Sequence, residues 1–361
     1  MTAIARPLAR PMSANSPLRR RMRRFTAVSG MTALGVLVLT AFLLPLLFMV
    51  TTAFKDKAQL TAQGAPWYPA VAETFEFEGA TYPLYQVPMP DGTVRTLALL
   101  QPGRESSVWI DPAAPEAGPI DWVGRWRTLT PGYRFSLYTE NFVTAWEQLN
   151  FPRLLFNTFM IAGIGTVGAV TSAVCVAYGF SRFRFPGRNG LFLLLLSTII
   201  LPLQVTLIPT YAVFSWLGWT GTWLPLTVPY FFSNAYNVFL LRQYFLTIPR
   251  ELDEAAMIDG AGPFRILLSV IVPQAKAAIV AVSLFHFFWA WNEFYLPLIY
   301  LQGNQSAEPL SVAIARFNGV YSQEPTLIQA AAIMAMIIPV FVFFLAQRAF
   351  MRGIVFTGVE K

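Results

Sequence analysis

The sequence predicts an all-α polytopic membrane protein with six transmembrane helices and a β-rich extracytoplasmic insertion between the first two. Of its 361 residues, 55% are hydrophobic and only 12% are charged, whereas a soluble domain is typically about 25% charged. Its mean hydropathy is +0.50. The apolar residues also form runs of roughly 20 residues or more, the length needed to cross a hydrocarbon core about 30 Å thick. Composition and run length together exclude an ordinary soluble domain.

Six apolar runs are long enough to be membrane spans. They cover residues 28–54, 156–180, 191–214, 223–241, 275–301 and 327–350. The first run follows a basic stretch, as the core of a cleaved signal does. However, it exceeds the roughly 7 to 15 apolar residues of a signal core, and no A-x-A site follows it. We therefore expect a retained helix over residues 27–54 and a helical core over residues 154–361.

The basic residues indicate how these spans are oriented. A net charge of +7 and an isoelectric point near 9.6 would also suit a nucleic-acid-binding protein. Seven arginines instead precede the first span: Arg6, Arg10, Arg19, Arg20, Arg21, Arg23 and Arg24. Further basic residues follow the second, fourth and sixth spans, whereas the loop after the third has none. Because short basic loops stay in the cytoplasm, we expect both termini there. The tail 1–26 is expected to lie near anionic membrane lipid rather than to bind nucleic acid.

The segment 55–153 is too polar to enter the membrane, and with this orientation it lies outside the cytoplasm. Residues 74–79 alternate apolar and polar side chains, and Asp91-Gly92 separates two strand-like runs, a pattern typical of a β-hairpin. We therefore predict that the segment 55–153 is a small β-rich insertion. Two roles remain open for this insertion: a solvated elaboration, or a docking surface for a partner.

The second predicted span carries a stripe of small residues. Gly165 and Ala169, like Gly168 and Ser172, have the small-xxx-small spacing that lets helix backbones approach closely in a membrane. The stripe therefore indicates helix packing. Cys175, the single cysteine of the chain, lies in the same span, so we expect neither an intrachain disulfide nor a cysteine-based metal site.

Three polar side chains in the fifth predicted span are candidates for a translocation pathway or gate. His286 would lie roughly 18 Å along a helix that enters near Gln274, close to the middle of the membrane, whereas Asn292 and Glu293 would lie about 27 Å along it. Polar groups inside a membrane are costly and often mark function. They serve equally well as interhelical hydrogen-bonding groups. For His286, the only histidine, packing is the preferred interpretation.

Motifs for enzymatic chemistry are absent from the sequence. It contains no G-x-S-x-G elbow, no H-E-x-x-H zinc motif and no G-x-x-x-x-G-K-[ST] phosphate loop. We therefore expect no catalytic residues and no metal or cofactor bound by this chain. Any energy that the protein uses must come from an ion gradient or from a partner. A gradient-driven secondary carrier is the main alternative, although such carriers usually show internal repeats and charged residues at mid-membrane.

Residues 247–273, between the fourth and fifth spans, gather carboxylates in a chain that is otherwise poor in charge. Glu251, Asp253 and Glu254 fall in the first turn of a predicted helix, where the helix dipole favours acidic side chains. Gly260 suits the end of this helix. The stretch lies on the predicted cytoplasmic side.

This helix is predicted to present one face of small and mildly apolar side chains. The members of that face, which follow the i, i+3, i+4, i+7 pattern, are Leu252, Ala255, Ala256 and Asp259. Residues 260–263 then break the chain before a second short helix, and Pro273 introduces the fifth span. The two short helices would form a compact cytoplasmic knob whose small-residue face lets another protein come close.

The spacing of this stretch resembles the EAA loop of the binding-protein-dependent ABC importer permeases. The family pattern is E-A-A, three residues, Gly, nine residues, then I-x-L-P. Its counterparts here are Glu254, Ala255, Ala256, Gly260, Val270, Val272 and Pro273. The sequences NVFLLRQYFLTIPRELDEAAMIDGAG, WAWNEFYLPLIYL and QRAFMRGIVFTGV are similar to those of the carbohydrate branch, the maltose-type permeases. The resemblance covers the first span and about residue 135 onward, but little of residues 71–134.

The resemblance implies an inner-membrane permease subunit with the type I importer fold, carrying a sugar or oligosaccharide. It also implies three protein partners: a second homologous permease, a cytoplasmic ABC ATPase dimer and an extracytoplasmic solute-binding protein. ATP and Mg²⁺ would be bound by the ATPase, so this chain would not be an enzyme.

In this family the EAA loop is the coupling helix, which sits in a groove of the ATPase dimer. Gly260 would then allow the turn, and Ala255 and Ala256 would allow the close approach. Glu254 and Asp259 would make polar or ionic contacts with the ATPase.

Overall fold

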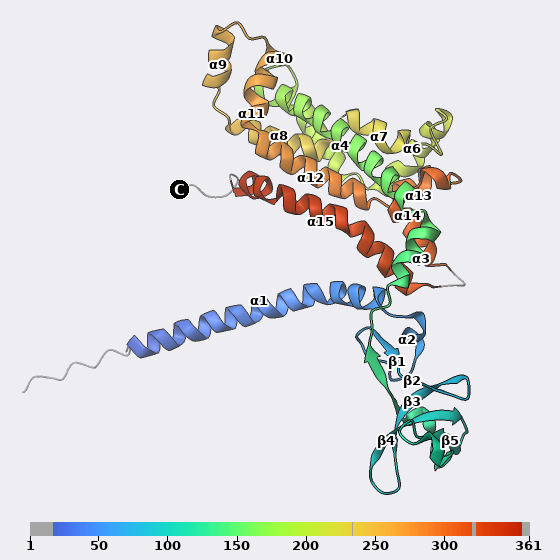
Figure 1. Cartoon of the computed structure of the whole chain (residues 1–361). Coiled ribbons are helices and arrows are strands. Elements are labelled where there is room, and N and C mark those ends of the chain that lie inside the picture. Colours follow the sequence, from blue (N-terminus) through green and yellow to red (C-terminus); the bar gives the residue numbers. More distant parts are fainter. Residues whose placement is uncertain (1–16, 233, 320–322, 356–361) are drawn as a thin grey trace, which may run out of the picture. The chain divides into compact units, whose positions relative to one another are not determined.

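The computed structural model describes residues 17–232, 234–319 and 323–355 (Figure 1). The chain divides into two compact units, residues 1–51 and 52–361. Most of helix α1 (Pro17–Ala53), which is 37 residues long, belongs to the first unit. Its segment Arg24–Ala53 has a mean hydropathy of 2.6 and is long enough to cross a membrane. Pro45 lies inside α1, as membrane helices tolerate.

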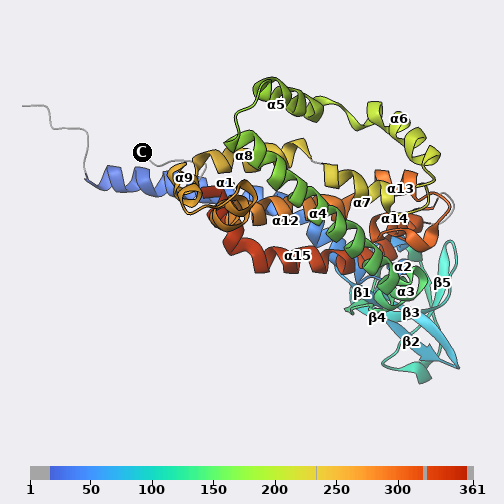
Figure 2. The ribbon, with the colours of Figure 1, turned by 90° about the horizontal axis from the view of Figure 1, so that it is seen from above.

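The helical core of the second unit is organised around α4 (Phe151–Arg182). This helix has 32 residues and packs against α8 (Ala235–Thr247) and α12 (Lys276–Asn292), while α12 also packs against α15 (Pro325–Val355). Figures 1 and 2 show α12 between α4 and α15. Buried apolar side chains of α4, α8 and α12 form one continuous cluster. Since lipid is as apolar as these side chains, close packing is what favours their association in a membrane.

The small residues of α4 lie where another segment comes close, as the sequence predicts. A Cβ atom added at Gly168 would lie 2.5 Å from the ring of Phe231. The Ser172 hydroxyl donates a hydrogen bond of 3.0 Å to the carbonyl oxygen of Tyr230. Both partners belong to the 3₁₀ segment η4 (Val228–Phe232). A larger residue at Gly168 would therefore force η4 away from α4.

The third predicted span is not one continuous helix. Its parts are α5 (Arg188–Ser197), η3 (Thr198–Ile200) and α6 (Leu203–Trp216). The two halves are bent by 99° relative to each other. Pro202 lies at the break, and a proline both lacks the amide hydrogen and disfavours a helical conformation in the residue before it. That residue, Leu201, is indeed extended, with ψ of 119°.

The fourth predicted span is divided as well. Its parts are α7 (Leu224–Thr227), η4 and α8. A new helix starts after Asn234, whose side-chain oxygen accepts a hydrogen bond of 3.1 Å from the amide of Asn237 and so caps α8. With 13 residues, α8 is shorter than the roughly 20 residues that a straight crossing needs.

The fifth predicted span is bent at its start, whereas the sixth is continuous. Short helices over Pro263–Gln274 meet α12 at 82°, and α13 (Tyr295–Tyr300) follows α12 after a short break. Among the described residues, three helices are long and apolar enough to cross a membrane, or up to five if each bent pair is one span. The core is helical, as predicted, but the count of six spans is not confirmed.

The segment between α1 and α4 contains both strands and short helices. Its strands are β1 (Ala70–Ala72), β2 (Thr74–Phe77), β3 (Ala80–Pro88), β4 (Val94–Gln101), β5 (Ser106–Ile110), β6 (Ile120–Val123), β7 (Thr130–Pro131) and β8 (Tyr133–Phe135). Its helical elements are α2 (Lys57–Thr61), η1 (Pro115–Ala117), η2 (Trp126–Thr128) and α3 (Glu140–Leu149). Strands β2 to β6 form an antiparallel sheet in sequence order, β7 pairs with β3, and β1 pairs with β8.

Asp91 and Gly92 form the turn of the β3–β4 hairpin, as the sequence predicts. Gly92 has φ of +82°, a conformation that glycine adopts without strain. The Asp91 carboxylate accepts hydrogen bonds from the amide and the hydroxyl of Thr93, at 2.9 and 2.6 Å. These bonds lower the pKa of Asp91. Side chains of the hairpin, including the fully buried Leu97, pack around Trp109.

The pairing of β1 with β8 brings the two ends of this sheet together, with Ala72 opposite Tyr133. Replacing residues 74–131 by an Asn-Gly turn is therefore expected to leave the helical core folded. The unfolding temperature in detergent should change by less than about 4 °C, the effect of roughly 1 kcal/mol. As a control, Asn141→Ala removes two buried hydrogen bonds from Nδ2, each of 2.8 Å, and should lower stability more. Failure of the shortened chain to accumulate in the membrane would contradict this expectation.

The segment after α13 returns to the first half of α4. Its short helices are η6 (Gln305–Ala307), α14 (Leu310–Ile314) and η7 (Ala315–Phe317). Asn157 Nδ2 donates to the carbonyl oxygens of Ser306 and Glu308, at 2.8 and 2.9 Å. Thr158 Oγ1 accepts from the amide of Leu310 at 2.8 Å. Two buried polar side chains of α4 thus satisfy the backbone of this loop.

Candidate functional site

The acidic stretch forms α9 (Glu251–Ile258), at one end of the helical core in Figure 1. Glu251, Asp253 and Glu254 occupy its first turn, where unpaired amide groups carry a partial positive charge that stabilises carboxylates. The predicted helix is confirmed. Its start is set by this local chemistry, which needs no contact with distant residues.

Gly260 ends α9 in a left-handed turn. Its amide donates to the carbonyl of Met257 at 3.0 Å, and the amide of Ala261 donates to the carbonyl of Ala256 at 2.9 Å. This pair of bonds is a Schellman motif, which needs a positive φ at its fifth residue; φ of Gly260 is +79°. A Cβ atom at Gly260 would meet no atom within 4 Å. The requirement for glycine is therefore conformational and not steric in the isolated chain.

Three short helical elements follow and return the chain to the core. They are α10 (Pro263–Ile266), the π-helical segment η5 (Leu267–Ile271) and α11 (Val272–Gln274). Pro263 is the first residue of α10, where a missing amide hydrogen costs nothing. Pro273 is exposed, and it has no amide hydrogen to continue the regular helical bonding next to η5. We call residues 251–274 the knob.

The knob carries exposed apolar side chains beside exposed charged ones. Its exposed large apolar side chains are Leu252, Met257, Ile258, Phe264 and Leu268. Ile258 is 87% exposed and Phe264 is 69% exposed. Exposed apolar side chains gathered in this way mark a surface that contacts protein or membrane.

Five of the predicted coupling residues lie on the exposed side of the knob: Glu254, Ala255, Asp259, Gly260 and Pro273. Ala256 does not, because it is half-buried against the core. It lies one turn after the buried Asp253, so both residues share the inward face of α9. The predicted face is therefore wrong in this one member.

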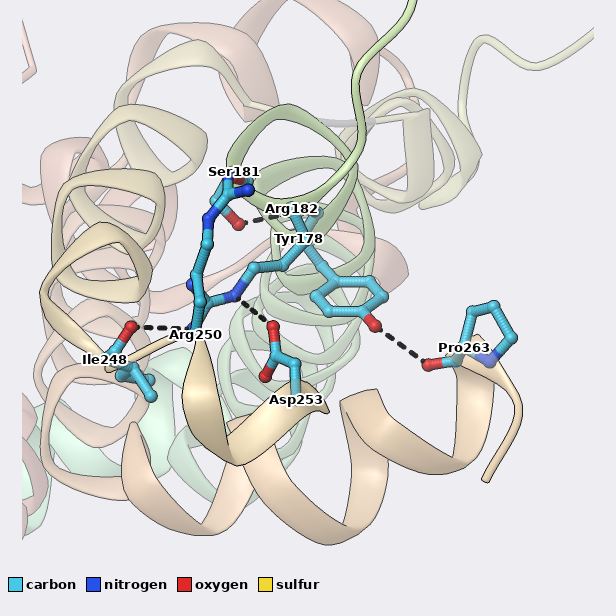
Figure 3. A network of polar contacts seen from close by, with 7 residues as sticks. All are labelled: Tyr178, Ser181, Arg182, Ile248, Arg250, Asp253 and Pro263. Atoms are coloured by element: carbon cyan, nitrogen blue, oxygen red, sulfur yellow. Dashed lines mark hydrogen bonds and ion pairs between the residues drawn. The ribbon is translucent and has the colours of Figure 1, made fainter. Parts of the chain in front are cut away.

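Arg182, in the last turn of α4, contacts both α9 and the chain just before it (Figure 3). Its Nε lies 2.9 Å from Oδ2 of Asp253, and the two side chains are only 6% and 10% exposed. Its Nη2 donates to the carbonyl oxygen of Ile248 at 3.0 Å. Burial raises the pKa of the Asp253 carboxyl, while the guanidinium groups of Arg182 and Arg250 oppose that shift.

Two further hydrogen bonds join the same turn of α4 to residues on either side of α9 (Figure 3). Arg250 Nη2, just before α9, donates to the carbonyl oxygen of Ser181 at 3.4 Å. The Tyr178 hydroxyl donates to the carbonyl oxygen of Pro263, at the start of α10, at 3.1 Å. A cavity of about 220 Å³ lies between this turn of α4 and the knob.

His286, the predicted mid-membrane candidate, is 5% exposed on α12. Its Nδ1 lies 3.4 Å from Nδ2 of Asn237 on α8. Its ring lies 4.8 Å from that of Tyr230 and 5.7 Å from that of Trp289, between centroids. His286 thereby connects α12 to α8 and η4. It also lines a cavity of about 340 Å³ together with Asn234, Tyr236, Asn237, Phe285 and Trp289.

The other two pathway candidates serve their local backbone. Asn292 is exposed, and its Nδ2 donates to the carbonyl of Phe288 in its own helix at 2.8 Å. Glu293 Oε1 accepts from the amides of Tyr295 and Leu296 at 3.0 and 3.2 Å, and so caps α13. Glu293 lines a different cavity from that of His286. The structure therefore does not gather the three candidates into one site.

The pairing of Arg182 with Asp253 was missed by sequence reasoning. The sequence marks one residue as a basic flank of a span and the other as a first-turn acid, and nothing in it links them. Their one shared signal is opposite charge on the same predicted side of the membrane. In the part of the chain that the structure describes, no group of three or more His, Cys, Asp or Glu residues could hold a metal ion.

The described residues contain three long apolar helices and two bent pairs of apolar helices, which is typical of a polytopic membrane protein. Residues 149–355 match the family described as "Binding-protein-dependent transport system inner membrane component". The chain belongs to this family. It is a permease component of an ABC importer, as the sequence predicts, and the gradient-driven alternative is not favoured.

Similar proteins are transport permeases and not enzymes. The "Osmoprotective compounds uptake permease protein GgtD" of Synechocystis sp. is 34% identical over 225 residues, which cover 62% of this chain and 76% of that protein. The "sn-glycerol-3-phosphate transport system permease protein UgpE" of Agrobacterium fabrum is 36% identical over 236 residues, covering 64% and 83%.

One solved structure is similar over almost the whole chain. It is described as a bacterial ABC transporter involved in the import of the acidic polysaccharide alginate. The match has a TM-score of 0.64 at 19% identity and covers 94% of this chain and 100% of the other. It supports the importer permease fold.

Proposed function

We propose that this chain is one of two related membrane subunits of an ATP-driven importer for a sugar or another uncharged polyhydroxy solute. In this arrangement six segments cross the inner membrane, both termini are cytoplasmic, and the divided segment 223–247 is the fourth crossing. Such broken helices are tolerated where neighbouring protein satisfies the free backbone groups. Residues 55–153 then lie outside the cytoplasm, on the side where a solute-binding protein delivers the substrate.

The exposed apolar surface of the knob is the observation that carries the coupling role. Exposure of Leu252, Ile258 and Phe264 to water is unfavourable in a solvated loop. These side chains would instead be buried in the groove of a separate ATPase dimer. Glu254 and Asp259 lie beside them with their carboxylates free to contact basic residues of that groove. ATP and Mg²⁺ would bind to the ATPase and not to this chain. Closure of the ATPase dimer would move the knob as a rigid body.

The cavity beside His286 supports an uncharged solute. Its lining, as far as the structure describes it, combines aromatic rings with the amides of Asn234 and Asn237 and includes no Lys, Arg, Asp or Glu. An anionic solute would lose its hydration there without gaining a cationic partner, which is costly. Rings and amides instead suit a polyhydroxy solute, whose apolar faces stack and whose hydroxyl groups exchange hydrogen bonds. Asn292 and Glu293 would lie at the outer end of this path.

Purification of the tagged chain from its own membranes tests the proposed function. We expect an ABC ATPase and a second, related permease to co-purify in fixed ratio, and the purified assembly to hydrolyse ATP. As a control, the same purification from cells in which the tag is fused to an unrelated membrane protein should bring down neither. Recovery of this chain alone, with solute uptake that responds to an ion gradient but not to ATP, would contradict the proposal.

A further inference from the structure

We propose that the buried Arg182–Asp253 pair is a positioning element that makes the knob and α4 move as one body. A displacement of α9 would then directly displace α4, the longest helix of the core. This inference rests on the proposed function, in which an ATPase moves α9. It concerns how the motion is passed on within the chain, and not which protein supplies it.

Helix α9 has little apolar anchorage of its own. Asp253 is its one buried residue, whereas Leu252, Met257 and Ile258 face outward. Apolar packing therefore secures α10 and η5, through Ile266 and its neighbours, but leaves α9 attached mainly by polar contacts. If those contacts were absent, a push on α9 could be absorbed by rotation of α9 about the Gly260 turn.

The polar contacts are arranged to prevent such a rotation. They attach residues 248–263 to one turn of α4 at three successive places. These places are Ile248 and Arg250 before α9, Asp253 within it, and Pro263 after it. The pair in the middle is the buried one. Two charges separated from water attract each other more strongly than an exposed pair does, so the central contact resists displacement most.

Arg182 is suited to this role by the shape of its side chain. Nε meets the Asp253 carboxylate while Nη2 donates to the Ile248 carbonyl oxygen, so one rigid fork holds both the helix and the chain that leads into it. A lysine has a single ammonium group on a flexible stem and would hold only one of the two. The same half of α4 packs against α8 and α12, so its displacement moves the helices that line the cavity beside His286.

The test uses the complete importer, reconstituted in lipid vesicles, with import and ATP hydrolysis measured together. Arg182→Gln and Asp253→Asn are expected to lower the amount of solute imported per ATP hydrolysed by about tenfold, a usual size for coupling between linked sites. The ATPase should still co-purify, because the outward surface of α9 is unchanged. Arg184→Gln is the matched control: Arg184 is exposed in the loop that follows, and its loss should leave the ratio unchanged.

Exchange of the two charges, in the double variant Arg182→Asp with Asp253→Arg, distinguishes positioning from a general loss of structure. We expect the double variant to import several-fold more solute per ATP than Arg182→Gln or Asp253→Asn. Two unrelated structural defects would instead lower import per ATP further than either single substitution does. Arg182→Lys keeps the buried charges balanced and is expected to assemble. In that variant hydrogen exchange should quicken at the amides of α9 and remain unchanged in α15.

Wild-type import per ATP in the single variants, absence of recovery in the double variant, or unchanged exchange in α9 would each overturn this inference. Failure of the proposed function would look different, because no ATPase would then co-purify with the unmodified chain.

Discussion

Replacement of Gly260 by proline is expected to abolish solute-stimulated ATP hydrolysis in the reconstituted importer, while the subunit still reaches the membrane. Proline holds φ near −65°, whereas Gly260 has φ of +79°. Proline also removes the amide that bonds to Met257. The turn between α9 and α10 cannot form with this residue, at a cost of roughly 3 kcal/mol or more. The knob would then present α9 in the wrong orientation to its partner.

A matched substitution distinguishes the backbone conformation that this turn requires from the room that it leaves for a side chain. Asparagine adopts the left-handed conformation more readily than other non-glycine residues, so Gly260→Asn should retain most of the stimulation if only conformation matters. Because a Cβ atom at this position has open space in the isolated chain, loss of stimulation in Gly260→Asn with normal stability would locate the ATPase directly against Gly260. Normal stimulation in Gly260→Pro would contradict the coupling role of the knob.

Glu254→Lys is expected to abolish solute-stimulated ATP hydrolysis by a different route. The side chain is exposed in the first turn of α9, so its reversal loses the favourable interaction with the helix dipole and should lower the stability of the isolated chain by only about 1 kcal/mol. At the interface, however, it would place a positive charge where we propose a basic groove. Like charges brought together in an interface cost several kcal/mol, which is enough to prevent docking.

Two measurements on the same preparation make this expectation decisive. The unfolding temperature of the isolated subunit should fall by no more than about 4 °C, while the amount of co-purified ATPase and the stimulated hydrolysis should fall together. Glu147→Lys, the same charge reversal at an exposed position of α3, serves as the control and should leave both at the level of the unmodified protein. Full stimulation in Glu254→Lys would mean that the acids of α9 are cap residues without a docking role.

Local signals in the sequence predicted the parts of the site that depend on neighbouring residues. The first-turn acids of α9, the glycine turn at Gly260 and the hairpin at Asp91-Gly92 all follow from short-range hydrogen bonding and backbone conformation. The breaks at Pro202 and Asn234 carried signals of the same kind. A long apolar run does not show where a helix is interrupted, so the runs alone predict these spans as continuous.

The orientation of individual side chains could not be predicted in the same way. Ala256 was placed outward on the basis of helical spacing alone, but the position of α9 on α4 turns it inward. Glu293 was a pathway candidate, and the break after α12 makes it the cap of α13. In each case a distant or newly formed element decided the outcome.

By itself, the sequence determined that this is a multispanning membrane protein of the importer permease family, with a short acidic helix ended by a glycine turn between two spans. Apolar run length, helix caps and the E-A-A to glycine spacing are all local properties, so they can be read without a structure. Only the tertiary structure decided which face of the knob is free and that Arg182 holds Asp253. Those facts depend on segments far apart in the chain meeting at one place, where burial makes a charge pair necessary.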